Sequence, residues 1–256
     1  MTASDAVPRA DGRSAAQPRR IKIESAFLAH AEGSASVRVG RTWVICAATV
    51  LDRQPPFLRG SGSGWVTAEY GMLPRAVENR LPRGRPSGRT EEIQRLIGRS
   101  LRTVVELEGL ATQTVLVDCD VIEADGGTRA AAITGGFVAL CEACRWMVRQ
   151  GRIRRIPVRE QLAAISVGRV GPAWLSDLTH AEDAAAAVDI NLVLTAAGEI
   201  VGLHADGERA PFASAALETI VELARRGLRR TFTAQRRALG LDPSAPFEGA
   251  KLMEAS

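Results

Sequence analysis

The order of its strand and helix patterns restricts the fold of this chain more than any other feature. Short β-prone runs separated by glycine turns predict one meander of strands over residues 21–49 and another after Pro157. Helical periodicity begins at Arg89, and a strand over residues 113–124 leads through a glycine turn into a second long helix. A third, amphipathic helix covers residues 213–239. Runs of strands interleaved with so few helices favour the α+β class over a doubly wound α/β sheet.

The size and composition of the chain are those of an ordinary globular protein. Its 256 residues can form one large domain or two small ones, and 46% of them are hydrophobic. We expect a single domain over residues 20–240, with flexible segments at 1–19 and 241–256.

The same composition bears on where the chain works. No continuous apolar run reaches the roughly 18 residues of a transmembrane helix, and the first twenty residues are charged and broken by proline. We therefore expect a cytoplasmic protein without membrane association. Four cysteines in a chain without a secretion signal do not make a disulfide framework, so we expect free thiols.

Arginine supplies nearly all of the positive charge. The chain carries 33 basic and 29 acidic residues, and only Lys22 and Lys251 are lysines. A GC-rich genome would explain this bias through codon usage. The functional explanation is that the guanidinium group presents a planar fork of donors suited to phosphate. Only the positions of the arginines can decide between the two.

Several common motifs can be excluded. Neither lysine follows a glycine, so there is no Walker phosphate loop, and the glycines at 60, 62 and 64 do not lead from a strand into a helix as in a dinucleotide-binding turn. Three scattered histidines and a single CxxC pair make zinc a poor fit. That pair, Cys141 and Cys144, falls on the apolar side of a helix, where core packing is the better interpretation.

Two positions could bind an anion. The sequence Gly126-Gly127-Thr128-Arg129 stands at a helix start, where backbone N–H groups lack partners and the helix dipole is positive. A plain tight turn explains the same glycines equally well. Arg89 begins another helix, and taken alone it is typical of a solvated charge at a helix end.

An acidic series follows in the second half of the chain. Asp177, Asp183 and Asp189, with Glu182 beside the second, interrupt an apolar stretch. Buried carboxylates need a metal ion or an arginine partner. A solvated turn is the simpler interpretation of Glu182 and Asp183, but less so of Asp189, which lies within a strand pattern.

Three long segments resemble the signature segments of the ribonuclease PH family of phosphate-dependent exoribonucleases. Shorter matches extend the likeness from Asp11 to the last helix, so that it covers nearly the whole chain. The long segments are PPFLRGSGSGWVTAEYGMLPRA (55–76), SGRTEEIQRLIGRSLR (87–102) and DCDVIEADGGTRAAAITGGFVAL (118–140).

The resemblance implies a ribonuclease PH fold, with βαβ-type layers similar to the ribosomal protein S5 domain 2-like architecture, assembled as a hexameric ring, a trimer of dimers. It implies removal of nucleotides from the 3′ end of tRNA precursors and other RNAs, with inorganic phosphate as co-substrate and nucleoside diphosphates as products. The reverse reaction would add nucleotides. Mg²⁺ is the implied metal.

The family's site residues carry over onto matching positions. Asp177 and Asp183 match its two essential aspartates, which would hold Mg²⁺ or protonate the departing 3′ oxygen. The basic loop offers four arginines to the tRNA backbone, although a solvated loop is the competing interpretation. The implied phosphate ligands are Arg89, Gly127, Thr128 and Arg129. The loop arginines are Arg75, Arg80, Arg83 and Arg85.

The chain also departs from the family. The loop between Arg75 and Ser87 is about four residues shorter than the loop that the family usually has at this place. At four positions alanine replaces the hydroxyl or acidic residues that the family has: Ala130, Ala132, Ala184 and Ala187. The segment 202–210 also differs from the family's usual sequence. These losses keep an alternative open, namely a weakened or non-catalytic RNA-binding subunit related to exosome ring proteins.

Overall fold

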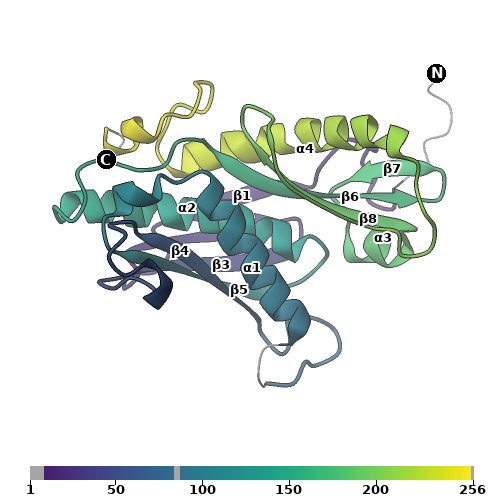
Figure 1. The fold of residues 1–256 in the computed structure, drawn as a ribbon. Coiled ribbons are helices and arrows are strands. Elements are labelled where there is room, and N and C mark those ends of the chain that lie inside the picture. Colours follow the sequence, from purple (N-terminus) through teal and green to yellow (C-terminus); the bar gives the residue numbers. More distant parts are fainter. Residues whose placement is uncertain (1–8, 84–86, 255–256) are drawn as a thin grey trace.

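Two β-sheets dominate the structure, a computed structural model that describes residues 9–83 and 87–254 (Figure 1). The strands are β1 (Ile21–Ser25), β2 (Gly33–Val39), β3 (Thr42–Leu51), β4 (Trp65–Met72), β5 (Thr114–Glu123), β6 (Leu162–Val170), β7 (Ala173–Ser176), β8 (Val188–Thr195) and β9 (Ile200–Asp206). The α-helices are α1 (Gly88–Thr103), α2 (Thr128–Arg149), α3 (His180–Ala185) and α4 (Leu217–Ala238).

The first sheet has the strand order β1-β2-β3-β5-β4. Its neighbours are antiparallel except for β4 and β5, which are parallel. Parallel neighbours need a crossover connection, and α1 provides it, which makes β4-α1-β5 a βαβ unit. The predicted alternation in β5 is confirmed, because one face of that strand is fully buried; its residues are Val115, Val117, Cys119 and Val121.

Helix α2 lies between the two sheets. It packs against β2, β3 and β5 on one side and against β6 on the other, which explains why it is apolar around most of its circumference. Gly135 allows the close approach, because a Cβ atom there would lie 2.7 Å from Val37 Cγ2. By length and composition α2 could cross a membrane, but 83% of its most apolar stretch is buried inside the protein. Cys141 and Cys144 are buried in it, and all four cysteines are free thiols, as predicted.

The second sheet is antiparallel, with the order β7-β6-β8-β9. Alternate residues of β6 enter two different cores: Leu162 and Ala164 join the core around α2, whereas Ala163 and Ile165 join a second core beneath α4. Figure 1 shows α4 running along this sheet. The predicted second meander and terminal helix are therefore confirmed, and the α+β class with them.

Both segments predicted to be flexible tails are packed against the body over their described parts. Arg9 and Arg19 are 5% and 7% exposed and bind the region around Asp177. At the other end, Phe247 and Leu252 are buried, and Arg145 Nε donates to the Leu252 carbonyl at 2.6 Å. Long-range contacts of a few side chains anchor these segments, and short-range sequence patterns do not reveal such contacts.

Candidate active site

The glycine turn between β5 and α2 leaves the N-terminus of α2 open. Gly126 and Gly127 have left-handed backbone angles, with φ of 77° and 68°, which glycine adopts readily. Gly127 is the N-cap residue of α2, and no side chain of the described residues caps the helix. The amides of the first helical turn have no intrahelical acceptor, and the helix dipole is positive here. The turn therefore presents N–H donors to an anion.

Thr128, the first residue of α2, is bonded to a tyrosine that the sequence patterns did not single out. The Tyr70 hydroxyl on β4 donates to Thr128 Oγ1 at 2.9 Å, so the hydroxyl proton of Thr128 is left to donate to an anion. Burial is the main cause of the raised pKa of Tyr70, and the charges of Arg129 and Arg89 partly offset it. Its only sequence signal is that it is the single tyrosine of the chain and lies in segment 55–76.

The two predicted arginine ligands of phosphate stand at the starts of two helices. Arg89 is the second residue of α1, and Arg129 is the second residue of α2. Both charges act on the Tyr70 hydroxyl, so the two helices begin close to the same point. Within residues 9–83 and 87–254 neither side chain has a hydrogen-bond or ion-pair partner. The structure thus brings together all four predicted phosphate ligands.

Two of the predicted acids lie near the glycine turn. Asp183 belongs to α3, whose N-terminus is closed by a capping box between Thr179 and Glu182. Asp189 lies on β8. Burial, followed by the negative charge of Asp183, raises the pKa of Asp189, while the charge of Arg129 acts in the opposite direction. The two carboxylates are therefore neighbours of the anion-binding turn.

Replacing Asp189 by asparagine is expected to raise the melting temperature of the metal-free protein at neutral pH by roughly 2–4 °C. The ionised carboxylate is unfavourable where it is half-buried beside Asp183, and asparagine can still accept the hydrogen bond from Asn191 Nδ2. The folded pKa lies above the unfolded pKa, so the gain disappears as the pH falls and the wild-type carboxyl binds its proton. Calorimetry of both proteins across pH checks this, and a less stable variant at neutral pH contradicts it.

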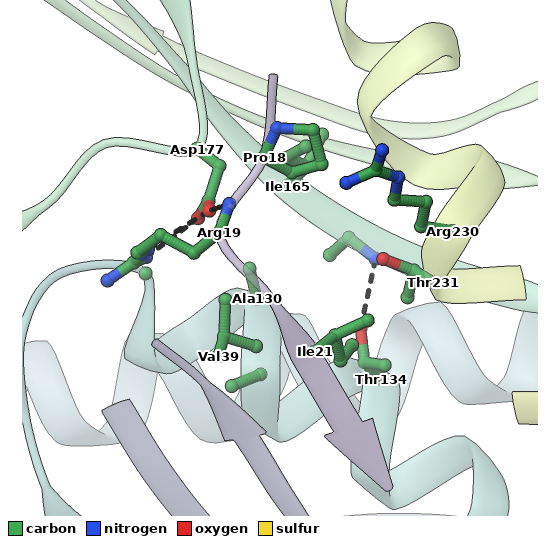
Figure 2. A pocket seen from close by; sticks show the side chains of 13 residues that line it. Pro18, Arg19, Ile21, Val39, Ala130, Thr134, Ile165, Asp177, Arg230 and Thr231 are labelled. Carbon is green, nitrogen blue, oxygen red and sulfur yellow. Dashed lines mark hydrogen bonds and ion pairs between the residues drawn. The ribbon is translucent and has the colours of Figure 1, made fainter. Parts of the chain in front are cut away.

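Asp177 was predicted to hold Mg²⁺ with Asp183, but its carboxylate is taken up by arginine. Oδ1 accepts from Arg19 Nη2 at 2.7 Å, and Oδ2 accepts from the Arg19 amide at 2.6 Å and from Arg19 Nε at 3.0 Å. Arg13 Nη1 lies 3.4 Å from Oδ2. Figure 2 shows Arg19 and Asp177 facing each other beside a small pocket. Both oxygens are engaged and the side chain is only 7% exposed, which favours a structural role for Asp177 over the predicted role as a metal ligand.

Glu182 is also held by the N-terminal segment and does not lie in a solvated turn. Arg9 binds it through two bonds, Nε to Oε1 and Nη2 to Oε2, each 2.7 Å long. Burial acts to raise the pKa of Glu182, but the bonds from Arg9 and the Thr179 amide, with the charges of Arg9 and Arg13, lower it overall. Asp183, the next residue, is thereby fixed in place through its backbone.

The predicted RNA-contacting loop is exposed. Arg75, Arg80 and Arg83 are all on the surface and have no ion-pair partner within the described ranges, whereas Arg85 lies outside the described residues. The substituted alanines are scattered. Ala132 is fully buried in the core, and Ala130 borders the pocket of Figure 2.

Comparison with known proteins agrees with this architecture. Models of the 3′ exoribonuclease family match domain 1 over residues 17–145 and domain 2 over residues 160–227. Ribonuclease PH of Exiguobacterium sibiricum is 49% identical over 236 residues, which are 91% of this chain and 94% of that protein. Ribonuclease PH of Solibacter usitatus is 49% identical over 232 residues, covering 89% and 98%.

Solved structures share the fold at low identity. A chain of the Archaeoglobus fulgidus exosome with RNA bound to the active site has a TM-score of 0.75 at 20% identity, covering 88% of this chain and 93% of that one. Rice Rrp46 has a TM-score of 0.71 at 20% identity, covering 89% and 98%.

Fold and site together define an α+β protein with an anion-binding turn beside a pair of acids. The chain belongs to the ribonuclease PH family of 3′ exoribonucleases. The resemblance of its signature segments is thereby confirmed. Its activity is that of a phosphate-dependent exoribonuclease, which is a nucleotidyltransferase because the terminal nucleotide is transferred to phosphate.

Proposed function

We propose that this chain trims the 3′ ends of tRNA precursors by phosphorolysis, releases nucleoside diphosphates, and adds nucleotides in the reverse reaction. One observation carries the proposal. Arg129, at the open N-terminus of α2, is close to Asp189, which in turn neighbours Asp183. The charges of Arg89 and Arg129 both reach the Tyr70 hydroxyl at the same turn. One continuous site can thus bind the phosphate anion and stabilise the negative charge that develops on the departing 3′ oxygen.

In the proposed reaction, phosphate is bound by Arg89, the Thr128 hydroxyl, Arg129 and the amides at Gly127. One of its oxygens attacks the phosphorus of the last phosphodiester in line. The bond from that phosphorus to the 3′ oxygen of the preceding nucleotide breaks, and the 3′ oxygen takes up a proton. Because the protein forms no covalent bond to the substrate, positioning and charge neutralisation supply most of the rate. We assign Asp183 to the departing oxygen.

Mg²⁺ is part of the proposal, and Asp183 with Asp189 is the donor pair that fits it. Among the described residues, no three or more His, Cys, Asp or Glu side chains form a complete metal cage. Mg²⁺ needs no such cage, since it binds through one or two carboxylates with water and substrate phosphate. When bound there, it would neutralise negative charge at the departing oxygen. This assignment replaces Asp177 with Asp189.

The exposed arginines of the 75–83 loop support the RNA part of the proposal. Their side chains are free to contact phosphates, and each such contact adds to the salt dependence of binding. We expect that replacing Arg75, Arg80 and Arg83 by alanine weakens tRNA binding and makes its salt slope shallower. Unchanged affinity and slope would mean that the loop is merely solvated.

We also propose that the chain works as a hexameric ring in the cytoplasm. Strand β9 is the last strand of its sheet, and Ile200 and Leu203 on it are 51% and 42% exposed. An exposed apolar edge of this kind is normally covered by a partner. The proposal predicts a solution mass of about six protomers of 27.3 kDa each, and a monomer would overturn it.

One assay tests the function against the alternative of an inert ring subunit. The purified protein is incubated with a 3′-extended tRNA and Mg²⁺, with and without phosphate. Nucleoside diphosphate release only with phosphate supports the enzyme, whereas RNA binding without release supports the inert subunit. An unrelated single-stranded RNA of equal length, degraded just as fast, would argue against tRNA precursors as preferred substrates.

The Tyr70→Phe variant is expected to raise the KM for phosphate by roughly 2–10-fold, with kcat less affected. One hydrogen bond is worth about 0.5–1.5 kcal/mol, and its loss frees the Thr128 hydroxyl to rotate away from the anion. Phosphate titrations at saturating RNA measure the effect. An unchanged KM would remove the Tyr70–Thr128 pair from the site.

A further inference from the structure

We propose that the buried Arg19–Asp177 ion pair is a joint that fixes α3 against the phosphate-binding turn. Asp177 would then serve the reaction as a positioning residue and not as a metal ligand. This inference rests on the proposed function. It gives the ion pair the role of keeping the phosphate-binding turn and α3 aligned.

The first argument is that one guanidinium group donates hydrogen bonds both to the phosphate-binding turn and to the segment that leads into α3. Besides Asp177, Arg19 donates to the Asp125 carbonyl through Nη1, to the Gly126 carbonyl at 3.3 Å, and to the Leu178 carbonyl at 3.1 Å. The first two carbonyls belong to the turn that precedes α2. The third lies in the short connection to α3. A planar fork of fixed geometry ties them to one relative position.

The second argument is that the two segments are in direct contact beneath this fork. A Cβ atom on Gly126 would lie 2.5 Å from the Leu178 carbonyl oxygen and 2.8 Å from the His180 amide nitrogen. In addition, His180 N donates to Asp125 Oδ1 at 3.4 Å. His180 is the first residue of α3, and Asp183 lies one turn further. A shift of residues 178–180 would therefore move the acid relative to the phosphate.

The third argument concerns Asp177 itself. Its φ is 56°, a left-handed conformation that non-glycine residues adopt at a cost and keep only where their surroundings enforce it. Packing behind the pair is incomplete, because a cavity of about 30 Å³ borders Arg19, Asp177, Gly127 and Ala130 (Figure 2). The ion pair therefore helps to hold the conformation, together with the hydrogen bond from the Asp177 amide to the Ser166 carbonyl at 2.7 Å.

The test uses Asp177→Asn and Arg19→Lys in the full chain. Asparagine tolerates the left-handed conformation, and lysine keeps the charge but loses the fork. We expect each variant to lower kcat by about a hundredfold, as a displacement near 1 Å does, with little change in the KM for phosphate. The kcat of the double variant is expected to be no lower than that of the slower single variant, because both single changes break the same ion pair. Arg20→Lys, at the exposed neighbouring position, is the matched control.

Two readouts separate positioning from metal binding and from catalysis. Mn²⁺ binding, followed by electron paramagnetic resonance, is expected to survive Asp177→Asn and to be weakened by Asp183→Asn. Amide hydrogen exchange without RNA or phosphate is expected to accelerate at residues 125–131 and 178–186, but not in α4. This second measurement stands even if the wild-type protein releases no nucleoside diphosphate, so a failure of the proposed function would be recognised separately.

The inference is overturned if Asp177→Asn loses Mn²⁺ affinity as Asp183→Asn does, or if the two single effects on kcat multiply. Should either variant not fold, Asp125→Ala removes only the acceptor of the His180 amide and a carboxylate 3.9 Å from Arg19. That variant is expected to lower kcat by about fivefold, as loss of one hydrogen bond would, with faster exchange in α3. Unchanged kcat and exchange would then overturn the inference.

Discussion

The Asp183→Asn variant is expected to lose about a thousandfold in kcat for nucleoside diphosphate release, within the 10²–10⁴-fold range of general acid catalysis. The change keeps the size of the side chain but removes the carboxyl group. Asp183 is the acid of α3 that neighbours Asp189, and it is the member of this pair that we assign to the departing oxygen. Single-turnover release from a 3′-extended RNA gives the measurement directly.

Its control is Asp52→Asn, which removes an exposed carboxylate paired with Arg152 outside this site. That variant is expected to keep wild-type kcat. If Asp183→Asn also keeps it, the departing oxygen is served by another group and the assignment of α3 is wrong.

The Arg129→Ala variant is expected to lose about 10²–10³-fold in kcat/KM for phosphate, as removal of a donor aimed at developing charge does. Its guanidinium is unpaired in the described structure and acts on both Tyr70 and Asp189, so it lies between the anion and the acids. Lysine at the same position is expected to recover only part of the loss, because it lacks the planar fork. Initial rates against phosphate concentration measure it.

The RNA affinity of Arg129→Ala is expected to change far less than its phosphate dependence. Arg95→Ala, on the exposed side of α1, is the control and is expected to behave as the wild type. A loss of RNA binding with normal phosphate dependence would place Arg129 in the RNA path and not at the phosphate.

Local patterns predicted most of the fold. The alternation in β5, the periodicity of α1 and the amphipathic stripe of α4 each depend on neighbours in sequence, and each is confirmed. The position of α2 between two sheets depends on contacts between distant segments. The same is true of residues 9–19, whose composition is that of a flexible segment although Arg9 and Arg19 are buried.

The site was predictable in kind but not in detail. The glycine turn and the arginines indicated a site that binds an anion. The acids indicated metal binding or proton donation. Which acids are free could not be predicted, because Asp177 is neutralised by Arg19, 158 residues earlier in the chain. Among the described residues, no arginine is bonded to the carboxylate of Asp189, and the pKa of Asp189 is raised. Tyr70 was missed because a lone buried tyrosine in a strand is typical of core packing.

Isotope-labelled phosphate tests the central claim most directly. The protein is given a 3′-extended RNA, Mg²⁺ and phosphate that carries the label, and the released nucleotides are separated and analysed. The account predicts nucleoside 5′-diphosphates with the label in the terminal phosphoryl group, and a sharp loss of them in Arg129→Ala. Unlabelled nucleoside monophosphates, released at the same rate without phosphate, would show hydrolysis and contradict the account.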